Sequence, residues 1–138
     1  MDISAVLLYG WPGKEFSVGE TYESLQWLSE DVPKPTLQEI ENLWPECLNQ
    51  IQIKIYKTEL EKLLNSVAAQ KDYRSQLSIV SYTSSSNPQW KAEADSFIDW
   101  RDALYSYALQ VMDNVLNGNI PAPTLEDFLQ GAPVIVWP

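Results

Sequence analysis

The first thirty residues alternate short apolar runs with turn residues, a pattern that is typical of short β-strands. Residues 3–9 (Ile3 to Tyr9) predict a strand, and Gly10-Trp11-Pro12-Gly13 predicts the turn that follows it. Residues 16–18 form a second short apolar segment, and residues 22–27 form a third extended one. We therefore expect a small N-terminal β element over residues 1–31, either a hairpin or a three-stranded meander.

Beyond Pro35 the apolar positions change to a helical spacing. Thr36 followed by Glu39 has the spacing of a capping box, so a helix is expected to begin here. Apolar residues then recur every three or four positions as far as Val67. Pro45 interrupts this pattern and would either kink one continuous helix or begin a second one. Residues 51–55 also alternate as in a strand, so both interpretations stay open for them.

A second helical pattern occupies the last third of the chain. Residues 83–88 have the composition of a serine-rich linker, and residues 77–82 before them suit a short strand or an extended arm. Asn87 and Pro88 predict the cap and first turn of a long helix that ends near Gly118. Thr124 predicts the cap of another short helix. The expected fold class is α+β, mainly helical, with a small N-terminal antiparallel β element and a long C-terminal aromatic-rich helix.

Length and composition limit the organisation of the chain. Its 138 residues suffice for a hydrophobic core in one or two small domains. The change of pattern separates the β element of residues 1–31 from a helical region of residues 32–138, which the linker at 83–88 would divide again. The single cysteine, Cys47, permits no internal disulfide and predicts a buried thiol. We expect neither a signal peptide nor a membrane span, since no apolar run approaches ~20 residues.

Charge and missing residue types exclude several function classes. A formal net charge of −10 disfavours nucleic acid and anionic membranes as partners. Without histidine, Ser-His and Cys-His nucleophilic systems and the common zinc sites are excluded. Asp95, Asp99 and Asp102 share one helical face that could hold a divalent cation, but a solvated face paired with Lys91 is favoured. We therefore expect no enzyme, no catalytic residue, no cofactor and no bound metal.

Large aromatic side chains and an apolar tail point toward protein binding. The aromatic residues of the long helix cover a wider face than a simple core stripe would need, and Trp, Tyr and Arg are typical of binding hot spots. The β-prone residues 134–138 would add a strand to the protein's own sheet or pair with a partner's exposed edge. The candidate partner-binding residues are Phe97, Trp100, Arg101 and Trp137. Packing into the monomer's own core is the alternative for the aromatic residues of the helix.

Three segments also carry motifs that occur together in a known family. They are Tyr22-Glu23-Ser24-Leu25-Gln26-Trp27, Lys34-Pro35-Thr36-Leu37-Gln38-Glu39-Ile40-Glu41 and Ala94-Asp95-Ser96-Phe97-Ile98-Asp99-Trp100-Arg101-Asp102. The third continues to Pro123-Thr124-Leu125-Glu126-Asp127-Phe128 and the Trp137-Pro138 end. They resemble the Tyr-x-x-Leu-x-Trp segment, the Lys-Pro-Thr helix start and the Phe-x-x-Trp-Arg helix of small bacteriophage tail fibre assembly proteins. Residues 51–86 show no such resemblance.

The resemblance implies a chaperone that binds the phage tail fibre protein, which would be a trimer, and helps it to fold or trimerise. It implies a place in the host cell cytoplasm during assembly, with or without retention in the virion tail. The Lys-Pro-Thr segment also occurs in tail structural proteins. A structural tail or fibre-associated virion subunit is therefore the alternative function.

Overall fold

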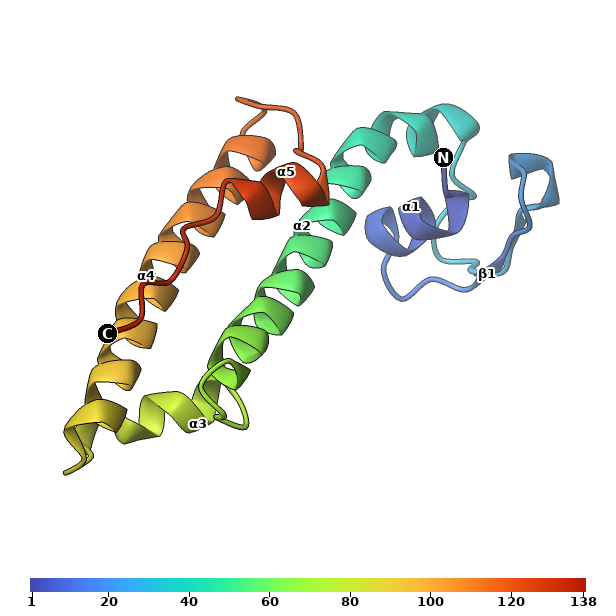
Figure 1. Cartoon of the computed structure of the whole chain (residues 1–138). Helices are drawn as coiled ribbons and strands as arrows, with labels where there is room; N and C mark the ends of the chain where they lie inside the picture. Colours follow the sequence, from blue (N-terminus) through green and yellow to red (C-terminus); the bar gives the residue numbers. More distant parts are fainter. The chain divides into compact units, whose positions relative to one another are not determined.

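The computed structural model describes all 138 residues, which form two compact units, Met1–Ile51 and Gln52–Pro138 (Figure 1). The fold is mainly helical and has one two-stranded antiparallel sheet, so the predicted α+β class is confirmed at this level. Helix α2, Leu37–Ala69, supplies residues to both units. The division thus falls inside a helix and not after residue 31, where the hydrophobic pattern changes.

The first unit begins with helix α1, Ile3–Gly10, where a strand was expected. The strand prediction for residues 3–9 is wrong because Asp2 caps a helix there, its Oδ1 accepting from the Ala5 N–H at 3.0 Å. Ile3, Val6 and Leu7 are buried together, since their spacing of three and four residues places them on one helical face. A continuous apolar run of this length fits either structure, and the cap decides between them.

The small sheet of the first unit pairs strand β1, Phe16–Ser17, with strand β2, Gln26–Trp27. Phe16 lies opposite Trp27, and their ring planes are within 6° of parallel at a centroid distance of 6.3 Å. The expected antiparallel element is therefore present as a two-stranded ladder. Its connection contains the 3₁₀ helix η1, Tyr22–Ser24, so the third extended segment begins later than predicted.

Helix α2 begins at the predicted capping box and continues through Pro45. The Thr36 N–H donates to Glu39 Oε2 at 2.7 Å, and the Glu39 N–H donates to Thr36 Oγ1 at 3.2 Å. Ile40 and Cys47, on either side of the proline, are both buried in the core of the first unit. This packing holds the helix together although Pro45 lacks an N–H, and residues 51–55 are helical and form no strand.

The second unit contains the last turns of α2, helix α3 (Gln76–Val80), the 3₁₀ helix η2 (Ser81–Ser84), helix α4 (Pro88–Leu116) and helix α5 (Leu125–Gln130). The strand or arm expected at residues 77–82 is wrong, because Ser75 caps α3 by accepting from the Ser78 N–H at 3.2 Å. The cap of α4 is confirmed, since Asn87 Oδ1 accepts from the backbone N–H groups of Gln89 and Trp90. No helix is long and apolar enough to cross a membrane.

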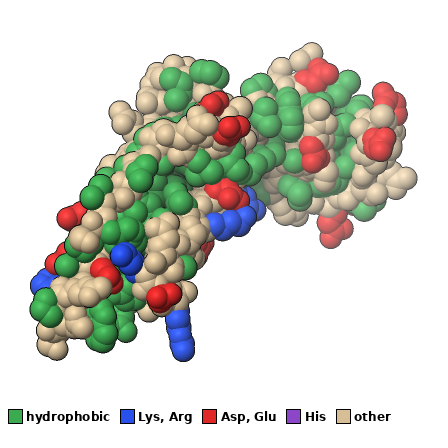
Figure 2. Space-filling model, viewed as in Figure 1, with side chains coloured by type: hydrophobic (Ala, Val, Ile, Leu, Met, Phe, Trp, Pro, Cys, Tyr) green, Lys and Arg blue, Asp and Glu red, His purple; other side chains and the backbone are tan.

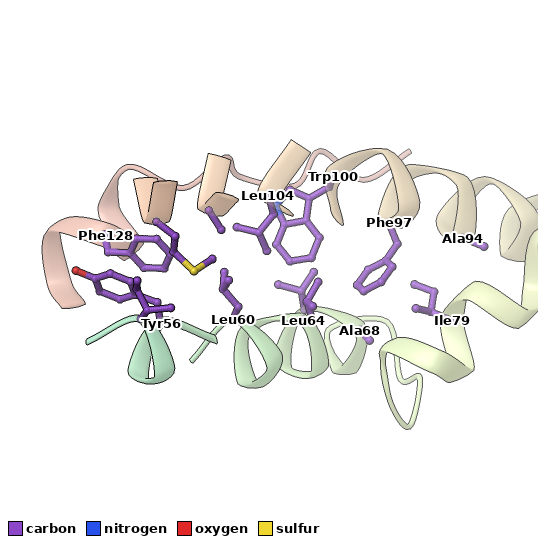
Figure 3. Close-up of a cluster of buried hydrophobic side chains, with 14 residues drawn as sticks. Tyr56, Leu60, Leu64, Ala68, Ile79, Ala94, Phe97, Trp100, Leu104 and Phe128 are labelled. Atoms are coloured by element: carbon purple, nitrogen blue, oxygen red, sulfur yellow. The ribbon is translucent and has the colours of Figure 1, made fainter. Parts of the chain in front are cut away.

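The core of the second unit lies between α4 and the adjoining turns of α2, which run side by side (Figures 1 and 3). Tyr56 of α2 stacks on Phe128 of α5 with ring centroids 4.2 Å apart, and its hydroxyl donates to the Pro123 carbonyl. From α4, Phe97 and Trp100 point toward α2 and meet edge to face, with centroids 5.5 Å apart. The two aromatic residues of the Phe-x-x-Trp-Arg motif therefore belong to this core.

Candidate functional site

The residues after α5 form an extended segment that runs back along α4 (Figure 1). We call residues 133–138 the C-terminal strap. The turn before it is tight: a Cβ on Gly131 would lie only 2.4 Å from the Tyr107 hydroxyl oxygen. That hydroxyl donates to the Phe128 carbonyl at 2.7 Å, so it is fixed in place. Glycine is required at residue 131 because the chain passes this close to α4.

Two tryptophan side chains attach the strap to the rest of its unit. Trp100 Nε1 donates to the Pro133 carbonyl at 2.8 Å, and Trp137 Nε1 donates to Gln70 Oε1 at 3.2 Å. The Lys71 ammonium lies 5.4 Å from the centroid of the Trp137 ring, within range of a cation–π contact. The strap is therefore held at both of its ends by indole N–H groups.

Between these attachments the strap alternates its side chains as a β-strand does. Ile135 and Trp137 pack against the core cluster, whereas Val134 and Val136 are 85% and 83% exposed. No backbone–backbone hydrogen bond joins residues 134–137 to the rest of the chain, and the only sheet is β1–β2. The strap thus adds no strand to the protein's own sheet, which was one of the two expectations. It presents a β-prone face and unpaired backbone groups to solvent.

The strap leaves space on both of its sides. A cavity of about 320 Å³ is lined by Trp100, Leu129, Ile135 and Trp137 among others. A shallower one of about 250 Å³, on the side of Val134 and Val136, includes Asp99 and Ala103 of α4. The strap is therefore bordered by accessible space along both sides.

A second apolar surface lies between α2 and α4, and we call it the α2–α4 groove. Its volume is about 400 Å³, and Leu60, Tyr105, Ala108, Leu109 and Met112 supply most of its wall. Tyr105 and Leu109 are 41% and 58% exposed, so this wall remains accessible. Lys57 and Glu61 flank the apolar wall. The sequence prediction missed this groove, although Tyr105 and Leu109 both lie outside the buried stripe of α4.

The four predicted partner-binding residues have different roles in the structure. Phe97 is fully buried and Trp100 is 6% exposed, so both are core residues. Arg101 donates from Nε and Nη2 to Asp102 Oδ1 at 3.0 and 2.8 Å and is paired within its own helix. Trp137 is half-buried and anchors the strap. The structure brings Trp100 and Trp137 together through the strap and leaves Arg101 outside that arrangement.

The acidic residues of α4 form a charged helical face. Lys91 Nζ contacts Asp95 Oδ2 at 2.8 Å, and Asp102 is paired with Arg101. No group of three or more His, Cys, Asp or Glu side chains is placed to hold a metal ion. Cys47 is 2% exposed, as expected of a buried thiol, and burial raises its pKa.

Comparisons of the chain with protein-family models, with curated proteins and with solved structures find no match. The geometry itself offers an anchored strap with a free strand edge and an apolar groove. Both features suit the binding of another polypeptide.

Proposed function

We propose that this protein is a bacteriophage tail fibre assembly chaperone that binds the tail fibre protein non-covalently and assists its folding or trimerisation. The observation that carries a protein-binding role is the strap, in which Val134 and Val136 are 85% and 83% exposed beside unpaired backbone groups. The choice of a tail fibre as partner is supported by the three sequence motifs that resemble tail fibre assembly proteins.

The strap would act by strand addition. An extended partner segment gains main-chain hydrogen bonds along an exposed edge, and pockets for alternate side chains then select the sequence. An incompletely assembled fibre has unpaired edges and apolar surface that favour aggregation. Pairing with residues 134–137 would cover such an edge until the fibre subunits meet one another.

The α2–α4 groove would hold an apolar side chain of the same partner. Tyr105 and Leu109 give it a partly exposed wall, and aromatic side chains contribute strongly at protein interfaces. Lys57 and Glu61 at its side supply one charge of each sign, which favours a defined orientation of the bound segment.

The acidic surface would keep the complex in solution. The chain carries 19 Asp and Glu against 9 Lys and Arg, and Figure 2 shows acidic side chains scattered among the hydrophobic ones. A strong net charge of one sign opposes self-association through mutual repulsion. A chaperone can then expose apolar groups and remain dispersed.

Co-expression with the fibre protein encoded nearby tests this function. The expected result is a complex that co-purifies and a larger trimeric fraction of the fibre than in its absence. The variant Val134→Ser/Val136→Ser should lose the complex while its circular dichroism stays unchanged. Leu77→Ser is the matched control, because Leu77 is 75% exposed on α3, away from the strap. Equal trimerisation of the fibre alone, with no complex, would refute the proposal.

A structural tail subunit is the second candidate, favoured by the Lys34-Pro35-Thr36 segment. Mass spectrometry of purified particles separates the two roles by stoichiometry. A structural subunit occurs in a fixed ratio to the other tail proteins, whereas a chaperone is depleted as particles mature.

A further inference from the structure

A polar cavity of about 450 Å³ lies at the other end of the second unit, away from the α2–α4 groove. The turn after α2, η2 and the first turns of α4 enclose it. The residues that matter to its chemistry are three aromatic residues, two carboxylates and an amide: Tyr73, Tyr82, Trp90, Asp72, Glu93 and Gln89. None of them was singled out by the sequence as a site.

The aromatic residues form inclined walls. The Tyr73 and Tyr82 rings meet at 64° with centroids 5.2 Å apart, and the Tyr82 and Trp90 rings meet at 79° and 5.6 Å. The three rings thus pack edge to face as one aromatic cluster, and this cluster lines the cavity. Trp90 is 47% exposed, so the outer wall can be reached from solvent.

One side of the cavity carries a buried carboxyl group that takes part in no ion pair. Glu93 is 5% exposed and is the only charged residue of the chain that is buried. It accepts from the Tyr73 hydroxyl at 2.8 Å and from Gln89 Nε2 at 3.1 Å, both neutral donors. None of the ion pairs of the chain includes it. A bound cation would supply the countercharge that the chain itself does not place beside this carboxyl group.

A second carboxylate, that of the exposed Asp72, also lines the cavity. Asp72 has a φ of +64°, a left-handed conformation that is uncommon for a residue other than glycine. The turn is fixed by the Tyr73 N–H, which donates to the Ala68 carbonyl at 3.2 Å. Burial is the main cause, and the hydrogen bond to Glu93 the second, of the raised pKa of Tyr73, which is about 12.

We propose that this cavity binds an organic cation, an ammonium or guanidinium group, between the aromatic walls and the Glu93 carboxylate. An anion would be repelled by both carboxylates. A neutral apolar ligand would bury Glu93 further without offsetting its charge. Aromatic faces attract cations through their quadrupole, and aromatic cages are a known way to recognise alkylated ammonium groups. The cavity adjoins the strap through Gln70 and Lys71, but the proposal does not depend on the role in fibre assembly.

The basic residue among those that line the cavity does not fill the site. Lys71 lines the cavity, but its ammonium lies over the Trp137 ring at 5.4 Å from the centroid and is held toward the strap. The Lys71 ammonium would therefore repel a bound cation only weakly. Lys71→Gln should therefore keep the affinity or raise it a few-fold.

The experiment titrates the full chain with choline and with dimethylbutanol, in which carbon replaces the ammonium nitrogen, and follows amide and indole N–H groups by NMR. Choline should shift the Trp90 indole and the Tyr73 and Glu93 amides, and should bind at least ten-fold more tightly than its neutral analogue. Glu93→Gln keeps the size and one of the two acceptor oxygens while it removes the charge, and should weaken choline at least ten-fold. Trp90→Ala should weaken it about 2- to 30-fold, the range of one cation–π contact.

Two further probes distinguish the source of the cation. If N-acetyl-lysine amide or N-acetyl-arginine amide binds ten-fold more tightly than choline, the ligand is a basic side chain of a partner protein. The reverse order assigns the site to a free alkylated amine. Equal affinity for choline and dimethylbutanol, shifts outside the cavity, or no binding of any cationic probe would overturn the proposal. A Glu93→Gln variant that is folded by circular dichroism and binds choline normally would do the same.

Discussion

Replacing Trp100 by alanine should destabilise the 52–138 unit severely. An aromatic side chain of this kind buries about 150–250 Å², and Trp100 is only 6% exposed. At about 25 cal/mol per Å² this area corresponds to ~4–6 kcal/mol. Alanine keeps a small part of this buried area, and the surrounding side chains relax into the space. We therefore expect the free energy of unfolding to fall by about 3–5 kcal/mol. Small domains have total stabilities of roughly 5–15 kcal/mol, so much of the stability would be lost.

Trp100→Phe should be milder than Trp100→Ala. It keeps an aromatic ring beside Phe97 but removes the donor to the Pro133 carbonyl and part of the buried ring volume, which together should cost about 1–3 kcal/mol. Urea unfolding followed by far-UV circular dichroism measures both variants without relying on tryptophan emission. Leu109→Ala is the control on the same helix, and at 58% exposure it should change stability little. A Trp100→Ala variant that loses less than about 1 kcal/mol would refute the assignment of Trp100 to the core.

Three further variants test other features of the structure. Gly131→Ala should lower the free energy of unfolding, measured with urea, by about 1–3 kcal/mol, because the new Cβ would meet the Tyr107 hydroxyl. If this contact is the cause, the double variant Gly131→Ala/Tyr107→Phe should lose less stability than the two single variants added together. Thr124→Ala should cost about 1 kcal/mol, since Thr124 Oγ1 accepts from the Asp127 N–H at 3.1 Å, and an unchanged urea midpoint would contradict this cap. Tyr73 has a folded pKa of about 12 against 10.0 ordinarily, so its contribution to stability is complete below pH 10 and is lost as the pH rises through 12. Tyr73→Phe should therefore flatten the fall of stability in this range, and an identical fall in both proteins would contradict it.

The sequence predicted those elements whose start is decided by a local side chain. Thr36, Asn87 and Thr124 each precede a helical spacing, and each accepts the N-cap hydrogen bond in the structure. Asp2 and Ser75 cap α1 and α3 in the same way, and they mark helices where strands were expected. Apolar runs of five to eight residues do not distinguish the two structures by themselves.

The candidate site was predicted only in part, because a sequence does not give the direction of a side chain. Trp100 and Trp137 were predicted to bind a partner, and in the structure their indole N–H groups attach the strap to its own unit. The exposed positions of the strap are Val134 and Val136, which follow from strand alternation once Trp137 is known to point inward. The cavity around Glu93 joins residues from three separate elements and could be found only from the fold.

The most direct test of the account is hydrogen–deuterium exchange at the strap, measured in the free protein and in a complex with the tail fibre protein. In the free protein the amides of residues 134–137 should exchange rapidly, since they have no backbone partner. In the complex they should become protected, while the exposed helix α3 around Leu77 keeps its own rate. Protection that is absent from the strap, in a complex that has formed, would contradict the claim that residues 134–137 bind the fibre.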